Sequence, residues 1–145
     1  MKPGRQFALA DRELDKASFG PVWLKDPRIA KLMVESLRYG QTEIQHYELH
    51  AYAVMANHVH ALLAPRIPLA GIMRSMKRKT AAAANLILGR SGQRFWQEES
   101  FDHWCRHAEE FARIKGYIEW NPVKAGLVER PEDWPWSSAS CSTGS

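Results

Sequence analysis

The sequence predicts a single domain that mixes helices with an antiparallel β-hairpin. Three stretches have helical spacing or helix-forming composition, at residues 27–39, 69–88 and 109–120. Between the first two, residues 44–55 and 58–64 are typical of strands, and Ala56-Asn57 forms a tight turn between them. The length of 145 residues suits one domain, without a repeat or a long linker.

The helix boundaries follow from capping residues. Asp26 followed by Pro27 predicts a helix start, because an acidic cap accepts free amide groups and proline suits the first turn. Gly40 is expected to end that helix, and Gly89 is expected to end the long helix that follows. Pro122 is expected to limit the last helix, because proline cannot donate a backbone hydrogen bond.

Both ends of the chain are expected to lie outside the folded core of the 1–145 domain. Residues 1–20 are mixed and charged, which predicts an N-terminal extension with a short helix at 10–17. Residues 137–145 are rich in Ser and are expected to be disordered.

Composition argues against a membrane protein and against a disulfide scaffold. No window approaches the roughly 18 apolar residues that a membrane span needs. Cys105 and Cys141 are the two cysteines, too few for a disulfide framework or a four-cysteine zinc site. A reducing, cytoplasmic location is therefore expected, with no membrane partner. The net charge of +4 is compatible with a polyanionic partner.

His58 and His60 form the first candidate site. Residues at i and i+2 of a strand point to the same face, so the two imidazoles can share one metal ion. Two partly buried structural histidines are the alternative interpretation. A two-residue turn places the small Ala53 opposite His60, which leaves space above the site, and puts His46 and His50 on the other face.

Tyr117 and Asn121 form the second candidate site. They are four residues apart and therefore share one helix face. A phenol beside a metal-polarised phosphate can attack in line and form a phosphotyrosine. The alternative is a helical tyrosine that packs its ring and hydrates its hydroxyl.

Together these motifs resemble the REP-associated tyrosine transposases, in the single-tyrosine branch of the HUH endonuclease superfamily. The resemblance covers about residues 20–139, with matching segments at 49–63, 95–102, 117–128 and 131–138. It implies an α+β, ferredoxin-like fold: an antiparallel sheet that carries the histidines, with the tyrosine helix packed over it.

The resemblance also implies a chemistry. His58, His60 and Asn121 would hold a divalent metal, Mg²⁺ or Mn²⁺, and Tyr117 would be the nucleophile. The substrate would be single-stranded DNA beside hairpin-forming palindromic repeats, cleaved and transferred through a 5′-phosphotyrosine. An inactive nucleic-acid-binding remnant is one alternative. A small-molecule metallo-hydrolase with Glu119 or Asp102 as base is another.

One departure concerns the first strand of the family, which lies centrally beside the His-x-His strand. Phe7-Ala8-Leu9 is short and soon followed by charges, so we expect this strand to be missing. An open edge would invite pairing with another chain, which predicts either a monomer or a strand-mediated homodimer.

The DNA surface is expected on the basic part of the long helix and the loop after it. These charges would follow phosphates, and Trp96 and Trp104, which lie among arginines in the sequence, could stack on unpaired bases. The candidate residues are Arg74, Lys77, Arg78, Lys79, Arg94 and Trp96.

Overall fold

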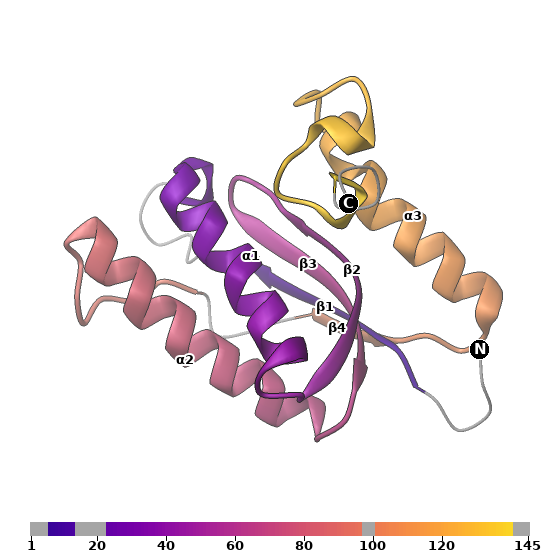
Figure 1. Ribbon diagram of the computed structural model, residues 1–145, viewed down its shortest axis with the longest axis horizontal. Helices are drawn as coiled ribbons and strands as arrows, with labels where there is room; N and C mark the ends of the chain where they lie inside the picture. Colours follow the sequence, from indigo (N-terminus) through magenta and orange to yellow (C-terminus); the bar gives the residue numbers. More distant parts are fainter. Residues whose placement is uncertain (1–5, 14–22, 97–100, 141–145) are drawn as a thin grey trace.

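The computed structural model describes residues 6–13, 23–96 and 101–140, which form a four-stranded sheet covered by helices (Figure 1). The strands are β1 (Ala8–Glu13), β2 (Tyr47–Val54), β3 (His58–Pro65) and β4 (Phe101–Trp104). The helices are α1 (Pro27–Thr42), α2 (Leu69–Leu88) and α3 (Ala108–Lys124), with 3-10 turns at Trp23–Lys25 and Pro131–Asp133. The expected α+β class is confirmed. No helix in the described ranges is long and apolar enough to cross a membrane.

The first strand of the sheet is present, so the expectation that it is missing is wrong. The sheet order is β2-β3-β1-β4, and β1 pairs antiparallel with both β3 and β4. Residues 7–10 are buried and alternate between the two hydrophobic clusters, as expected for a central strand. The charged residues that follow in β1 hid this pattern in the sequence. Residues 10–13 are therefore strand rather than helix or extension, and 14–17 lie outside the described residues.

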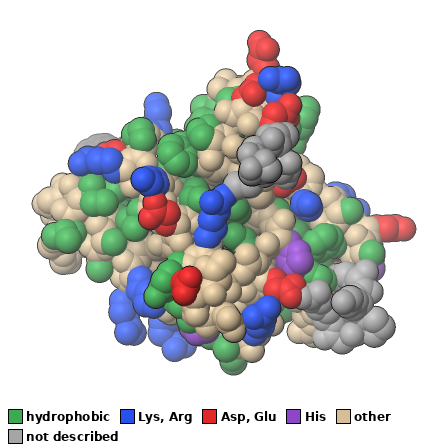
Figure 2. All heavy atoms as spheres, viewed as in Figure 1, with side chains coloured by type: hydrophobic (Ala, Val, Ile, Leu, Met, Phe, Trp, Pro, Cys, Tyr) green, Lys and Arg blue, Asp and Glu red, His purple; other side chains and the backbone are tan. Residues whose placement is uncertain are grey.

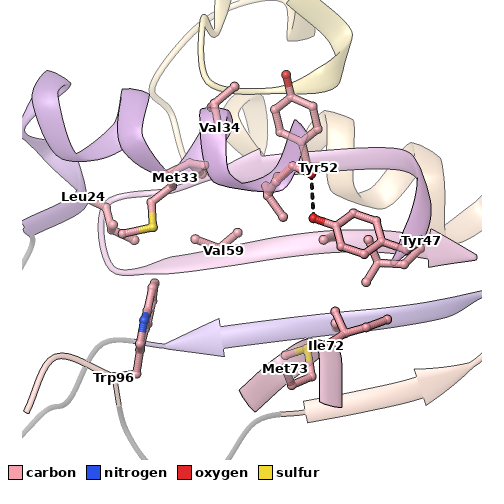
Figure 3. Close-up of a cluster of buried hydrophobic side chains, with 14 of the residues drawn as sticks. Leu24, Met33, Val34, Tyr47, Tyr52, Val59, Ile72, Met73 and Trp96 are labelled. Carbon is pink, nitrogen blue, oxygen red and sulfur yellow. Dashed lines mark hydrogen bonds between the residues drawn. The ribbon is translucent and has the colours of Figure 1, made fainter. Parts of the chain in front are cut away.

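The helices form two unequal layers on the sheet. α1 and α2 cover one face, and α3 packs on the other (Figure 1). The larger cluster, between the sheet and the α1–α2 layer, includes Met33, Val59, Ile72 and Trp96 (Figure 3). The smaller cluster joins Leu62 and other sheet residues to Ile118 of α3. The elements run β1-α1-β2-β3-α2-β4, which is the ferredoxin-like order, and α3 is added on the opposite face.

The β2–β3 hairpin has the predicted register at the histidine end. Ala53 pairs with His60, and Ala51 pairs with Leu62. A bulge between Leu49 and Ala51 breaks the alternation farther along β2. His50 consequently faces α3, where its ring lies 4.9 Å from the ring of Phe7. The prediction that His50 lies on the opposite face was therefore wrong, because a strict period of two cannot anticipate a bulge.

The C-terminal residues 134–138 pack along β2, so the prediction of disorder is wrong for residues 137 and 138. Ser137 bridges Ala53, and the Trp134 indole N–H donates to the carbonyl of Val54 at 3.1 Å. The Ser138 hydroxyl lies 2.6 Å from Glu119 Oε2 of α3 and also accepts a bond from the backbone of β2. Backbone pairing with the edge strand holds this segment. Residues 141–145 of the expected tail lie outside the described residues.

Helix ends follow the predicted caps at two of four positions. Asp26 caps α1 by accepting from the Arg28 amide at 2.9 Å, and Gly89 ends α2 with a left-handed φ of 70°. Gly40, in contrast, lies inside α1, and Pro122 lies inside α3. Both helices are therefore longer than expected, because buried packing around these two residues outweighs their low helix propensity.

Gly40→Ala is expected to destabilise the fold by about 1–3 kcal/mol, although Ala is the better helix former. A Cβ at residue 40 would overlap the hydroxyl and ring of Tyr47. The Tyr47 ring is buried and its hydroxyl donates to the Leu37 carbonyl at 2.6 Å (Figure 3), so it has no room to move aside. Urea unfolding measures the change.

The matched control is Gly71→Ala in α2, where the added Cβ would meet only Ile67 Cδ1 at an ordinary 3.7 Å. That variant should be neutral or more stable than the parent chain. Equal stability of the two variants would contradict the packing explanation for Gly40.

Candidate nucleophile and metal site

His58 and His60 lie side by side at the start of β3, on the face that α3 covers. Their ring centroids are 4.4 Å apart with the planes nearly perpendicular. His60 is only 5% exposed, whereas His58 is partly exposed. Val59, between them, points into the opposite cluster. The alternation of the strand therefore gives the two imidazoles one common face, as predicted.

The neighbouring turn orients the first histidine. His58 Nδ1 lies 2.7 Å from the Asn57 side-chain amide at Oδ1, and this contact orients the His58 ring. A metal ion at this site would bind the other ring nitrogen of His58, Nε2. Sequence reasoning missed this role of Asn57. The sequence does contain a signal for it, because Asn57, whose side chain can form hydrogen bonds, directly precedes the candidate ligand His58.

Asn121 approaches the same pair from α3. Its amide nitrogen lies 3.1 Å from His60 Nε2. The amide oxygen and nitrogen have the same shape, so a half-turn of the side-chain amide would present the oxygen to the same place. Pro122, the next residue of α3, is buried. The predicted third ligand therefore lies next to the second.

Tyr117 completes the group one turn earlier on α3. Its ring centroid is 5.8 Å from that of His60. The side chain is 48% exposed, so a phosphodiester can approach the phenol from solvent. The structure therefore brings together all four residues that the sequence singled out for catalysis and metal binding. The alternative, a helical tyrosine that packs its ring and hydrates its hydroxyl, is compatible with the same exposure.

The donor set fits a divalent cation. Two imidazole nitrogens and one amide oxygen are acceptable ligands for Mn²⁺ and, less favourably, for Mg²⁺. Within the described ranges, no three His, Cys, Asp or Glu side chains gather as a metal site. Glu119, a candidate base of the hydrolase alternative, is bound instead to Ser138. The side chain of Asp102, the other candidate, lies outside the described residues.

Contacts of Glu110 with His103 and His107 hold the N-terminal end of α3, the helix that carries Tyr117. His107 caps the helix by accepting from the Glu110 amide at 3.2 Å. Glu110 Oε1 lies 2.9 Å from His103 Nε2, and this hydrogen bond holds the pKa of the Glu110 carboxyl below its usual range. Because that pKa is lowered, this contact stabilises α3 above the usual carboxylate pKa and weakens as the pH falls.

The cations predicted to bind DNA separate into two places. Four cations, Arg74, Lys77, Arg78 and Arg94, line one hollow of about 540 Å³ between α2 and the loop after it. Lys79 lines a different groove, between α1 and α2. Figure 2 shows Lys and Arg side chains gathered at the lower left of the molecule, along the helix that Figure 1 labels α2.

Trp96 is the exception, because its indole belongs to the core. It is 3% exposed, and its N–H donates to Thr80 Oγ1 at 2.9 Å. The prediction that this ring stacks on bases is therefore wrong. The neighbouring arginines in the sequence indicated an exposed indole, but the Trp96 indole is buried beneath the cations that line the hollow.

The family comparison covers the whole candidate site. The family described as Transposase IS200 like matches residues 24–121, more than half of the chain. A REP-associated tyrosine transposase of Escherichia coli (strain K12) is 27% identical in an alignment of 97 residues that covers 63% of this chain. The chain spans about half the length of that curated relative, 54%.

Two solved structures share the fold. One is a REP-associated tyrosine transposase bound to a REP hairpin, with a TM-score of 0.68 and 19% identity over 93% of this chain and 76% of that one. The other is a candidate transposase from Deinococcus radiodurans R1, with a TM-score of 0.55 and 23% identity over 82% of this chain and 96% of that one. At these identities the likeness concerns the fold alone.

Proposed function

The chain belongs to the Transposase IS200 like family, and from this premise we propose that it is a metal-dependent endonuclease and strand transferase. It would act on single-stranded DNA next to hairpin-forming repeats. The observation that carries the proposal is the meeting of an exposed Tyr117 with His58, His60 and Asn121. The hairpin is suggested by the REP hairpin named with the structural relative.

The proposed reaction is an in-line displacement at phosphorus. The phenolic oxygen of Tyr117 attacks, its proton passes to water, and the bond from phosphorus to the 3′ oxygen breaks. The 3′ oxygen takes up a proton and leaves as a hydroxyl, while the 5′ phosphate stays on the tyrosine. The new bond is still a phosphodiester, so a second 3′-hydroxyl can reverse the step and transfer the strand.

The other residues orient the reacting groups. His58, His60 and Asn121 would hold Mg²⁺ or Mn²⁺, which when bound supplies Lewis acidity to a phosphoryl oxygen. The buried position of His60 keeps its imidazole fixed on the sheet, and the contact with Asn57 orients the ring of His58. The partial exposure of Tyr117 leaves one side of the phenol open to the DNA.

The cationic hollow on α2 is proposed as a phosphate-binding surface. None of the described residues that line it is acidic. Trp96 and Lys77, which line it, also line a small apolar pocket with Val59, behind the two histidines. The hollow and the tyrosine site therefore lie on opposite faces of the sheet, on either side of β3. DNA held at the hollow would pass around the end of the sheet to reach Tyr117.

Arg78→Ala is expected to weaken DNA binding and to reduce the slope of log Kd against log salt by about 0.7–0.9, because one phosphate contact is lost. Fluorescence anisotropy of a labelled hairpin oligonucleotide at several salt concentrations measures the slope. Lys79→Ala is the matched comparison, since this neighbouring cation faces the other groove. A larger loss of slope for Lys79→Ala would contradict the assignment of the hollow.

The proposed reaction is tested by a covalent-product assay. Hairpin oligonucleotides with single-stranded flanks are labelled at either end, incubated with Mn²⁺ or with EDTA, and run on a denaturing gel. The 3′-labelled strand should migrate with the protein, and the 5′-labelled strand should appear as a free fragment ending in a 3′-hydroxyl. Salt-sensitive binding without any covalent product would favour an inactive DNA-binding remnant of the family.

A further inference from the structure

The solvent face of α3 beside Tyr117 carries a large aromatic side chain that the proposed chemistry does not use. Trp120 is 54% exposed and follows Tyr117 by three residues. At this spacing the two side chains are neighbours on the helix surface, with about 5–6 Å between their Cβ atoms. The sequence predicts base stacking at two other tryptophans, Trp96, which is buried, and Trp104, which is exposed.

Gly116 leaves the backbone bare next to this tryptophan. Glycine inside a helix costs stability relative to alanine, so its presence calls for a reason. A Cβ at residue 116 would meet nothing within 4 Å, and close packing against the described residues is therefore not that reason. Gly116 lies one turn before Trp120, on the same face. The Trp120 indole therefore stands next to helix backbone that no side chain of the described residues covers at Gly116.

The same face carries positive charge at both ends. Arg113, Tyr117, Trp120 and Lys124 follow one another at intervals of four, three and four residues, and all four are exposed. Aromatic rings between cations are the combination that binds single-stranded nucleic acid, because bases stack on the rings and phosphates pair with the charges. An apolar surface that binds another protein would not need these flanking cations.

We infer that Trp120 is a stacking platform for an unpaired DNA base next to the phosphate that Tyr117 attacks, with Gly116 giving the nucleotide room to lie close to the helix. The inference rests on the proposed function for its choice of ligand. Trp120 acts as a positioning residue, since stacking fixes the nucleotide and thereby the phosphodiester in front of the phenol. The site differs from the α2 hollow, which recognises phosphates only.

The test measures binding of a short oligothymidylate, about 12 nucleotides long, because stacking on aromatic side chains tolerates any base. Tyr117→Phe serves as the parent, so that no covalent product forms. Adding Trp120→Ala should weaken binding about 5-fold to 100-fold. An abasic strand of the same length should bind both proteins equally, because it offers phosphates without bases.

Three further variants separate stacking from other effects. Trp120→Phe should restore part of the affinity, because a smaller ring still stacks. Trp104→Ala is the matched control: Trp104 is 44% exposed, but it pairs with Ala8 and lies on the opposite face of the sheet. Gly116→Leu should raise the thermal stability of the helix and yet weaken binding of oligothymidylate, since its side chain fills the proposed site.

Unchanged affinity for oligothymidylate in Trp120→Ala would overturn the inference, and so would an equal loss for the abasic strand. Self-association of the parent that disappears in Trp120→Ala, with DNA binding intact, would instead make this face a protein contact. Because these measurements require only binding, they stand apart from the covalent-product assay. If the chain forms no adduct but binds DNA through Trp120 in a base-dependent way, the proposed reaction is wrong and the inference about Trp120 still holds.

Discussion

Tyr117→Phe is expected to abolish the covalent protein–DNA product while leaving binding of the hairpin oligonucleotide within about two-fold of the parent protein. The substitution removes only the phenolic oxygen and keeps the ring that lies 5.8 Å from His60. Loss of a nucleophile lowers the rate of a covalent step by at least about a thousandfold. Single-turnover gels quantify the adduct, and anisotropy measures the binding.

The control for this variant is Tyr39→Phe, another exposed tyrosine, which lies on α1 across the sheet. It should form the adduct at the parental rate. Persistence of the adduct in Tyr117→Phe would mean that another side chain attacks the phosphate, and the assignment of the nucleophile would be wrong.

Replacing both His58 and His60 by Ala is expected to remove metal-dependent cleavage. The donor set would lose its two nitrogen ligands and keep only the amide of Asn121, so affinity for Mn²⁺ should fall by at least about a hundredfold. Isothermal titration with Mn²⁺ measures this directly, without reference to catalysis. The adduct should disappear at the same time, because Tyr117 would face a phosphate with no Lewis acid.

His46→Ala is the matched comparison for the double variant, because His46 lines the groove between α1 and α2, away from this site. Its affinity for Mn²⁺ should equal that of the parent. Thermal unfolding of the double variant separates loss of ligands from loss of the fold, since His60 is buried. A folded double variant that still binds Mn²⁺ tightly would place the metal elsewhere.

Local pattern was enough to predict the site. The alternation of a strand places His58 and His60 on one face, and the helical repeat places Tyr117 and Asn121 on another. A two-residue turn set the register of Ala53 against His60, which the structure has. What the residues alone could not provide is the packing of α3 onto β3, which joins the two pairs; the family resemblance implied it.

The failures share a cause, because each depends on contacts between residues far apart in sequence. β1 was hidden because the apolar run at its start, residues 7–10, is only four residues long, and its pairing with β3 and β4 is invisible in the sequence. Gly40 was interpreted as a helix end, but its lack of a side chain leaves space for the buried Tyr47 ring. Trp96 resembled a surface residue because only its partner Thr80, sixteen positions earlier, reveals that it is buried.

Mapping the adduct by mass spectrometry tests the central claim most directly. Trypsin cleaves after Lys115 and Lys124, and the peptide 116–124 contains Tyr117 as its single tyrosine among the four in the chain. After reaction with Mn²⁺ and nuclease trimming, this peptide should carry the mass of a nucleotide linked through its 5′ phosphate to Tyr117. A nucleotide on Tyr39, Tyr47 or Tyr52, or a peptide 116–124 that stays unmodified while DNA is cut, would contradict the account.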